Sequence, residues 1–193
     1  MLYVLMGKSA TGKDTIFRRL MKLPELNLKK IVPYTTRPMR HGEIDGQEYH
    51  FVDEAAMSKL DSEGKIAESR CYNTVHGNWY YFTADDGTNI KDGSARYITI
   101  GTLEAYTKLR DYYGQKYVTP IYVYVDDFER MKRSLCREKK QAAPSVAEVC
   151  RRFLADENDF SEELLEAAGV NIFFENIHID TCVDAIKHMI LSN

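Results

Sequence analysis

The chain has 193 residues, of which 44% are hydrophobic and 28% are charged. This length suits one domain with a substantial core and argues against two full domains, and the composition excludes a disordered tail. No apolar run approaches the roughly 20 residues of a membrane span. A formal net charge of −3 argues against a protein that coats nucleic acid through bulk positive charge. We therefore expect neither a membrane nor a nucleic acid as a partner.

The cysteines carry no metal-binding signature. They form no C-x-x-C pair and are not grouped with histidine at metal-ligand spacing; they are Cys71, Cys136, Cys150 and Cys182. The N-terminus has neither the basic start nor the long apolar stretch of a signal peptide. We predict reduced thiols in a cytoplasmic protein that has no obligate protein partner.

The first half of the chain begins like a parallel α/β domain. Residues 2–6 form a short apolar run typical of a strand buried on both faces, and an amphipathic helix over 15–23 stops before Pro24. Residues 29–52 are polar and extended, which favours a small lobe of strands and turns. A helix over 53–64 and an aromatic strand over 79–82 follow.

The second half returns to the core pattern and adds a basic helical segment. The predicted elements are a strand over 97–100, a helix over 102–113, a strand over 121–125, helices over 128–138, 145–155 and 161–168, a strand over 172–174 and a helix over 181–191. Together they predict an α/β core with one polar, β-rich insertion and one basic, helical insertion.

A glycine-rich turn follows the first predicted strand. Its sequence, G-x-x-x-x-G-K over residues 7–13, lies between a strand and a helix, which is the context of a P-loop. Backbone N–H groups and the helix N-terminus would bind a triphosphate, with Lys13 on the β- and γ-phosphates. The alternative is a tight turn with an exposed lysine. The predicted ATP-binding residues here are Gly7, Ser9, Ala10, Thr11, Gly12, Lys13, Asp14 and Thr15.

Asp14 departs from the usual P-loop, in which a Ser or Thr hydroxyl follows the lysine and binds Mg²⁺. Its carboxylate could bind Mg²⁺ directly or through water, and Thr15 offers a hydroxyl one position later. The alternative is that Asp14 is simply favoured in the first turn of its helix. We assign Asp14 and Thr15 to a Mg²⁺ site as a hypothesis.

A second set of cations lies in the polar stretch 34–51. Arg37 and Arg40 are close in sequence to hydroxyl groups and to Tyr49, and paired guanidinium donors match the oxygens of a phosphate monoester. The full pattern is T-T-R-x-x-R-x-G-E-x-x-G-x-x-Y-x-F. With the P-loop before it, this pattern resembles the guanylate kinase family.

The resemblance implies a P-loop NTPase fold, a three-layer α/β/α core with a parallel sheet. It also implies a nucleoside-monophosphate-binding lobe over 33–83, here called the acceptor lobe, and a helical lid over 128–159. The core would then comprise residues 1–32, 84–127 and 160–193 of one guanylate-kinase-like domain.

The resemblance also assigns acceptor residues. Arg37, Arg40 and Tyr49 would hold the acceptor phosphate, and Glu68 would accept two hydrogen bonds from guanine, which adenine cannot donate in that pattern. Tyr81, with Tyr80 as the alternative, and Thr83 would complete the pocket. The predicted GMP-binding residues are Thr36, Arg37, Arg40, Tyr49, Glu68, Tyr81 and Thr83.

Three departures affect this pocket. Pro33 replaces a serine, and Thr99-Ile100-Gly101 lacks both acids of the family's D-x-D. The segment 70–77 is longer than expected, and Asn73 and His76 either supply groups to the pocket or are solvated.

The basic helices supply a predicted clamp. Arg133 and Arg137 share one helix face, and Arg152 matches the family's third lid arginine. The alternative is a solvated basic surface. Asn176 resembles the family residue near adenine, although it could equally be a turn residue.

The resemblance implies a kinase that moves the γ-phosphoryl group of ATP, with Mg²⁺, to GMP or dGMP and gives ADP and GDP or dGDP. Its predicted catalytic residues are Lys13, Arg37, Arg133, Arg137 and Arg152. The alternatives are a kinase with another acceptor, and a catalytically weak module that binds phosphorylated ligands.

Overall fold

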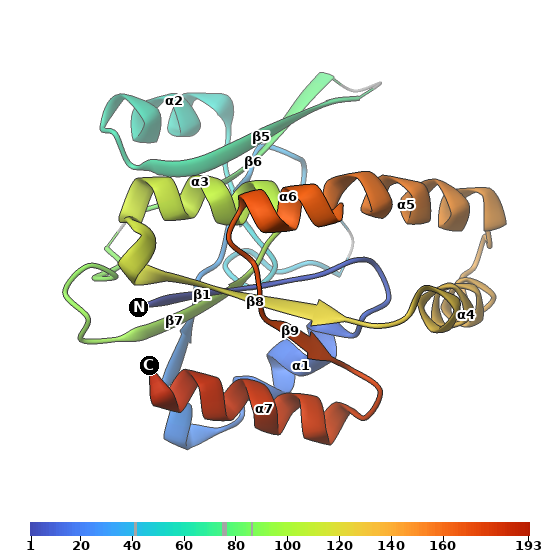
Figure 1. Cartoon of the computed structure of the whole chain (residues 1–193). Coiled ribbons are helices and arrows are strands. Elements are labelled where there is room, and N and C mark those ends of the chain that lie inside the picture. Colours follow the sequence, from blue (N-terminus) through green and yellow to red (C-terminus); the bar gives the residue numbers. More distant parts are fainter. Residues whose placement is uncertain (41, 75–76, 86) are drawn as a thin grey trace.

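The computed structural model describes residues 1–40, 42–74, 77–85 and 87–193. Its centre is a parallel sheet with the strand order β2-β7-β1-β8-β9 (Figure 1). The strands are β1 (Leu2–Met6), β2 (Leu28–Lys30), β7 (Arg96–Ile100), β8 (Val118–Tyr124) and β9 (Phe173–Glu175). The predicted parallel α/β core is therefore confirmed.

Strand β1 shows why this sheet needs helices on both faces. Alternate side chains of a strand point to opposite faces, and all five residues of β1 are buried. Leu2, Val4 and Met6 join a cluster with α3 (Leu103–Tyr113) and α6 (Glu162–Ala167). Tyr3 and Leu5 join a second cluster with α1 (Lys13–Leu20) and α7 (Ile179–Ser192). The core therefore has the predicted α/β/α layers, with these helix pairs on opposite faces in Figure 1.

Helix α1 begins two residues earlier and ends three residues earlier than predicted. Gly12, in the left-handed region with φ of 90°, precedes it, so the helix starts directly from the glycine-rich turn. A short 3-10 helix, Pro24–Leu26, follows and leads into β2. The polar segment predicted over 29–52 is thereby divided, because β2 pairs with β7 in the central sheet.

A second, mixed sheet has the strand order β4-β3-β6-β5. Its strands are β3 (Tyr34–Thr35), β4 (His50–Phe51), β5 (Ile66–Thr74) and β6 (Gly77–Ala84), with α2 (Glu54–Ser62) between β4 and β5. Strand β5 was not predicted. It pairs antiparallel with β6, and the Nζ of Lys108 on α3 donates to the carbonyl oxygen of Ser69 at 2.8 Å. This bond ties the second sheet to the core.

Two helices stand beyond the carboxyl ends of the central strands (Figure 1). They are α4 (Asp127–Glu138) and α5 (Val146–Asp159), as the basic helical segment predicted. Asp126 caps α4 and Ser145 caps α5, each through its side-chain oxygen. Within the described ranges, no helix has the length and apolar character needed to cross a bilayer.

Candidate active site

The glycine-rich turn has the geometry of a phosphate-binding loop. Gly7 has φ of 147°, and a Cβ there would lie 2.3 Å from the carbonyl oxygen of Val123 on β8. Only glycine therefore lets the chain pass this close to the neighbouring strand. Ala10 and Gly12 also have positive φ, 63° and 90°, and the turn leads directly into the N-terminus of α1.

Lys13 lies folded back over this turn. Its Nζ donates to the carbonyl oxygens of Gly7 at 2.5 Å and Lys8 at 2.9 Å. Burial lowers the pKa of Lys13, while the carboxylates of Asp14 and Asp156 act in the opposite direction. A buried cation held only by carbonyl oxygens would gain from an anion placed beside it.

A cavity of about 350 Å³, here called the phosphate pocket, opens beside Lys13. It brings together three of the groups predicted to act on ATP: the P-loop, the start of α1 and two lid arginines. Its lining residues are Ala10, Gly12, Lys13, Asp14, Thr15, Arg18, Arg133 and Arg137. Arg133 and Arg137 line this pocket, Arg133 half-buried and Arg137 exposed, and their predicted role as a clamp stays a prediction.

The third predicted lid arginine lies elsewhere. Arg152 lines a small neighbouring cavity, which also includes Ser9 and Asp156, rather than the phosphate pocket. Its Nε donates to the Oε1 of Glu148 on the same helix at 2.7 Å. Arg137 lines both cavities, so Arg152 lies next to the phosphate pocket without entering it.

Asn176 is used by the P-loop itself. It is buried, and its Nδ2 donates to the carbonyl oxygen of Thr11 at 2.8 Å. The backbone carbonyl oxygen of Asn176 accepts from the Nη2 of Arg133 at 3.2 Å. Asn176 therefore connects the turn to α4, and its predicted place near adenine stays a prediction.

Asp14 and Thr15 can supply oxygen ligands to a cation. Both line the phosphate pocket, and within the described residues neither side chain forms a hydrogen bond or ion pair. No group of three or more His, Cys, Asp or Glu side chains in the described chain could hold a metal by itself. A Mg²⁺ ion that takes one or two protein ligands and phosphate oxygens fits this arrangement.

A second cavity of about 470 Å³, here called the lobe cleft, lies between the core and the acceptor lobe. Two residues of α1, Asp14 and Arg18, line both the lobe cleft and the phosphate pocket. The other lining residues are Phe17, Lys30, Ile31, Pro33, Glu48, Tyr49, Thr99 and Ile100. The two cavities therefore share a wall.

Arg37 is held inside the acceptor lobe by Glu43. Its Nη1 and Nη2 donate to the Oε2 and Oε1 of Glu43 at 3.0 and 2.7 Å, and its side chain is only 3% exposed. This ion pair raises the pKa of Arg37 and lowers that of Glu43. Within the described residues, the buried Nε of Arg37 has no hydrogen-bond partner. Because this Nε is buried, it can reach a further acceptor only if the acceptor lobe moves.

The other residues predicted to bind the acceptor phosphate differ in their distance from Arg37 and in their exposure. The guanidinium lies 5.7 Å from the ring of Tyr49, whose pKa is raised by burial. Arg40 is exposed, and its backbone N–H donates to Glu43 at 2.6 Å. Thr36 holds the lobe together, because its Oγ1 accepts from the backbone N–H of Tyr80 at 3.0 Å.

Glu68 and Thr83 meet across the paired strands β5 and β6. Glu68 is 4% exposed, and its Oε1 accepts from the Oγ1 of Thr83 at 2.9 Å. Arg70, on the same strand, donates its Nε to the Oε2 of Glu68 at 3.2 Å. The Nη2 of Arg70 also donates to the Oε1 of Glu68 at 3.4 Å, so three of the carboxylate's roughly four acceptor positions are taken and one remains.

The strand register also distinguishes Tyr81 from Tyr80, the two tyrosines that the sequence offers for the acceptor pocket. Tyr81 pairs with Arg70 and Thr83 pairs with Glu68, whereas Tyr80 pairs with Cys71. Because side chains alternate along a strand, Tyr81 shares a face with Thr83 and Tyr80 does not. Tyr81 also packs against Tyr49, with ring centroids 5.5 Å apart.

Two of the three departures from the family pattern line the lobe cleft, and the third lies in the pair of strands β5 and β6. Pro33 and Thr99 line the lobe cleft, where Asp14 and Glu48 supply the acidic groups. The long segment is the β5–β6 hairpin, in which Asn73 is exposed and pairs opposite Asn78. His76 lies outside the described residues.

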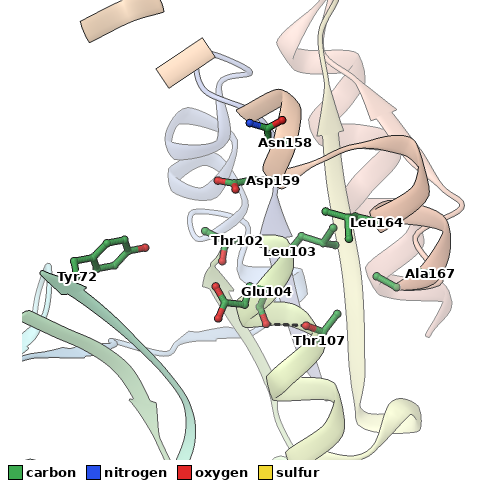
Figure 2. Close-up of a pocket in the computed structure, with 10 residues that line it drawn as sticks. Tyr72, Thr102, Leu103, Glu104, Thr107, Asn158, Asp159, Leu164 and Ala167 are labelled. Carbon is green, nitrogen blue, oxygen red and sulfur yellow. Dashed lines mark hydrogen bonds between the residues drawn. The ribbon is translucent and has the colours of Figure 1, made fainter. Parts of the chain in front are cut away.

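The hairpin carries Tyr72 toward a third cavity, of about 530 Å³, which Figure 2 shows. Tyr72 faces the start of α3, where Thr102 and Glu104 lie, and Asp159 at the end of α5 also lines this cavity. The ring of Tyr72 packs against that of Tyr81 at 5.5 Å. This cavity therefore adjoins the aromatic groups of the acceptor lobe.

Sequence reasoning assigned no role to five residues around these cavities. Glu43, Arg70, Arg130 and Asp156 act as partners of predicted residues or of the P-loop, and Arg18 lines two cavities. Two of them had a sequence signal: Glu43 is a fixed position of the pattern over 35–51, and Arg70 lies two residues after Glu68, where residues of a strand share a face.

Comparison with known proteins agrees with this geometry. The family model described as guanylate kinase matches residues 1–192. The guanylate kinase of Nitratidesulfovibrio vulgaris is 45% identical over 78 residues, which cover 40% of this chain and 35% of that protein. The guanylate kinase of Syntrophus aciditrophicus is 28% identical over 186 residues, which cover 95% of this chain and 82% of that protein.

The fold is also similar to that of a solved structure. The crystal structure of guanylate kinase from Anaplasma phagocytophilum aligns with a TM-score of 0.69 at 21% identity, covering 100% of this chain and 85% of that one. Some relatives are matched over only part of their length, between 35% and 62% of it. Since the family model spans nearly every residue, the chain belongs to the guanylate kinase family.

Proposed function

We propose that this chain transfers the γ-phosphoryl group of ATP to GMP or dGMP, giving ADP and GDP or dGDP. The observation that carries the proposal is the shared wall of two cavities: Asp14 and Arg18 line both the phosphate pocket and the lobe cleft. A triphosphate in the first would reach a phosphate monoester at the edge of the second, where Tyr49 is the one predicted acceptor residue among the lining residues. The proposal divides the chain into core, acceptor lobe and lid at the boundaries predicted above.

The donor would lie in the phosphate pocket. The P-loop amides and the N-terminus of α1 would bind its phosphates, and Lys13 would exchange its carbonyl partners for the β- and γ-phosphate oxygens. Arg133 and Arg137 would lie on the other side of the same phosphates. Arg152 would join them from the neighbouring cavity by leaving Glu148.

Mg²⁺ would be held by the Asp14 carboxylate and the Thr15 hydroxyl, directly or through water. When bound, it would neutralise part of the charge on the phosphate oxygens. The lack of hydrogen-bond partners for both side chains among the described residues supports this assignment.

The acceptor would lie against the second sheet. Arg37, Arg40 and Tyr49 would hold its phosphate once a movement of the acceptor lobe exposes the guanidinium of Arg37, which Glu43 orients. Glu68 would accept from the guanine N1–H and amino group by releasing a donor of Arg70, while Thr83 fixes the orientation of its carboxylate. Tyr81 would complete the pocket on the face it shares with Thr83.

Catalysis would come from alignment and charge. The transition state of phosphoryl transfer spreads negative charge over the moving group, and no covalent enzyme intermediate is needed. Lys13, Arg133 and Arg137 would stabilise that charge from the donor side. Arg18, whose Nε donates to the backbone oxygen of Asp14 at 3.2 Å, would face the moving group from the shared wall.

The proposal is tested by incubating the purified chain with ATP, Mg²⁺ and GMP. ADP and GDP should form in equal amounts, and Lys13→Met should lower kcat by at least about 100-fold. ADP formed without GDP would indicate hydrolysis. Retention of a phosphopeptide without turnover would indicate a binding module. Either result contradicts the proposal.

The acceptor is tested by a panel of monophosphates. GMP and dGMP should have the highest kcat/KM among GMP, dGMP, AMP, CMP and UMP. Turnover of another monophosphate with higher kcat/KM would keep the phosphoryl transfer and reject GMP as the acceptor. Pro33 and Thr99, which line the lobe cleft where the family pattern has other residues, make this comparison necessary.

A further inference from the structure

The lid helices α4 and α5 both form hydrogen bonds with the backbone of one P-loop residue, Ser9. Its N–H donates to the Oδ2 of Asp156 on α5 at 2.7 Å, and its carbonyl oxygen accepts from the Nη1 of Arg130 on α4 at 3.4 Å. Arg130 and Asp156 also contact each other at 3.4 Å. Both backbone polar groups of Ser9 are thus held by an ion pair that joins two helices.

The environment of Arg130 makes this contact more than a surface ion pair. Its side chain is 1% exposed, and its Nη2 donates to Asp127 and Glu157, each at 2.7 Å. Its guanidinium lies 4.6 Å from the ring centroid of Phe153. A buried cation is tolerated only when it is paired and hydrogen-bonded. Asp127 lies on α4 itself, but Arg130 contacts Glu157 and Phe153 only while α4 and α5 pack together.

A second ion pair supports the same contact. The Nζ of Lys8, the P-loop residue before Ser9, lies 2.6 Å from the Oε2 of Glu157 on α5. Two successive P-loop residues are therefore bound to α5. Together these contacts dock α4 and α5 on the P-loop.

The position of Arg130 on its helix links the contact to the phosphate pocket. Arg130 lies three residues before Arg133 and seven before Arg137, so the three side chains share one face of α4. Arg133 and Arg137 line the phosphate pocket. Fixing Arg130 against Ser9 therefore fixes the rotation and distance of α4 relative to that pocket.

We propose that Arg130 and Asp156 are positioning residues of the donor site, which hold Arg133 and Arg137 over the phosphate pocket. The inference rests on the proposed role of that pocket in binding ATP.

Kinetics of three variants test this role. Arg130→Met and Asp156→Ala should each raise the KM for ATP by about 10-fold or more and lower kcat, because misplaced arginines bind the phosphates less well. The KM for GMP should stay unchanged. Asp156→Asn should lie between wild type and Asp156→Ala, since its amide oxygen can still accept from Ser9. Arg151→Met, which changes an exposed arginine of α5, is the matched control and should behave as wild type.

Three outcomes would overturn the proposal. A lower KM for ATP in Asp156→Ala would mean that the carboxylate competes with the phosphates. Equal rises in the KM of ATP and GMP would mean a general effect on folding. Unchanged kinetics in both Arg130→Met and Asp156→Ala would mean that the contact has no role in positioning.

A binding measurement separates this proposal from that of GMP phosphorylation. Calorimetry with ATP alone should give a weaker Kd for Arg130→Met and Asp156→Ala, whether or not the wild type phosphorylates GMP. Amide hydrogen exchange of the nucleotide-free protein should be slow for Ser9 in the wild type and faster in both variants. Fast exchange of Ser9 in the wild type would contradict a docked lid.

Discussion

The side-chain nitrogen of Asn176 donates to the carbonyl oxygen of Thr11 at 2.8 Å, which joins the end of the central sheet to the P-loop. The same nitrogen lies where a side chain on the next residue would go. A Cβ at Gly12 would be 2.6 Å from the Nδ2 of Asn176. Gly12 is therefore required both by its φ of +90° and by the close approach of a buried amide.

Gly12→Ala should accordingly destabilise the protein by about 1–3 kcal/mol, the range for backbone strain at a tightly constrained position. It should also raise the KM for ATP, because Asn176 must move away from Thr11. Urea denaturation and steady-state kinetics measure the two effects. Gly64→Ala is the matched control, since Gly64 has φ of +67° with open space around it. An ATP KM that rises equally in both variants would contradict the role of Asn176.

ATP binding should cause the amine of Lys13 to take up a proton at alkaline pH. Burial lowers the pKa of Lys13 below its ordinary 10.5 in the free protein, and phosphate oxygens beside the ammonium would raise it again. Between the lowered value and 10.5, ATP should therefore bind with proton uptake. In the same window the unfolded chain binds more protons than the folded one, so the free energy of unfolding of the free protein should rise with pH.

Calorimetry in buffers of different ionisation enthalpy measures this proton uptake. The binding enthalpy of ATP should depend on the buffer in the wild type, and Lys13→Met should remove that dependence. The same buffer dependence in both proteins would show that another group takes up the proton.

Glu68→Gln should weaken GMP much more than ATP. The amide replaces one acceptor oxygen by an NH2 donor and removes the negative charge that faces guanine, and hydrogen bonds to a charged group contribute about 1.5–3 kcal/mol. We expect the KM for GMP to rise about 10- to 100-fold with the KM for ATP unchanged. Glu166→Gln, on the exposed side of α6, should change neither value. Equal losses for both substrates in Glu68→Gln would reject Glu68 as the residue that reads the base.

Glu43→Gln should leave the buried guanidinium of Arg37 without its anion. The variant should unfold at a lower temperature, and GMP should restore more of that stability than it adds to the wild type, because its phosphate would pair with Arg37. Thermal unfolding with and without GMP measures both effects. Glu25→Gln, which breaks an exposed pair with Lys187, is the control. A GMP effect equal to that of the wild type would argue against a phosphate beside Arg37.

The parts of the fold that the sequence predicts are those governed by local pattern. The apolar run of β1 and the glycine-rich turn after it predict their own structure, because burial on both faces and positive φ leave visible residue choices. Strand β5 was missed because it mixes charged and polar residues, and seven of its nine residues are not fully buried. Its pairing with β6 gives it the strand conformation.

The missed site residues are those whose roles depend on partners distant in the sequence. Arg130 and Asp156 are 26 residues apart and meet only when α4 packs against α5. Glu43 is six residues from Arg37, across a turn whose geometry the sequence pattern does not specify. Arg18 looked like a surface residue of an amphipathic helix, and only the placement of the acceptor lobe beside α1 gives it two cavities to line.

The most direct test uses one compound that spans both cavities, adenosine and guanosine joined through their 5′ oxygens by five phosphates. If the phosphate pocket and the lobe cleft share a wall, the compound should bind once per chain, compete with both ATP and GMP, and bind at least about 100-fold more tightly than either, because the second contact becomes intramolecular. Calorimetry gives the stoichiometry and the Kd. Two molecules bound per chain, or an affinity no higher than that of ATP alone, would contradict two phosphate sites that meet in one cleft.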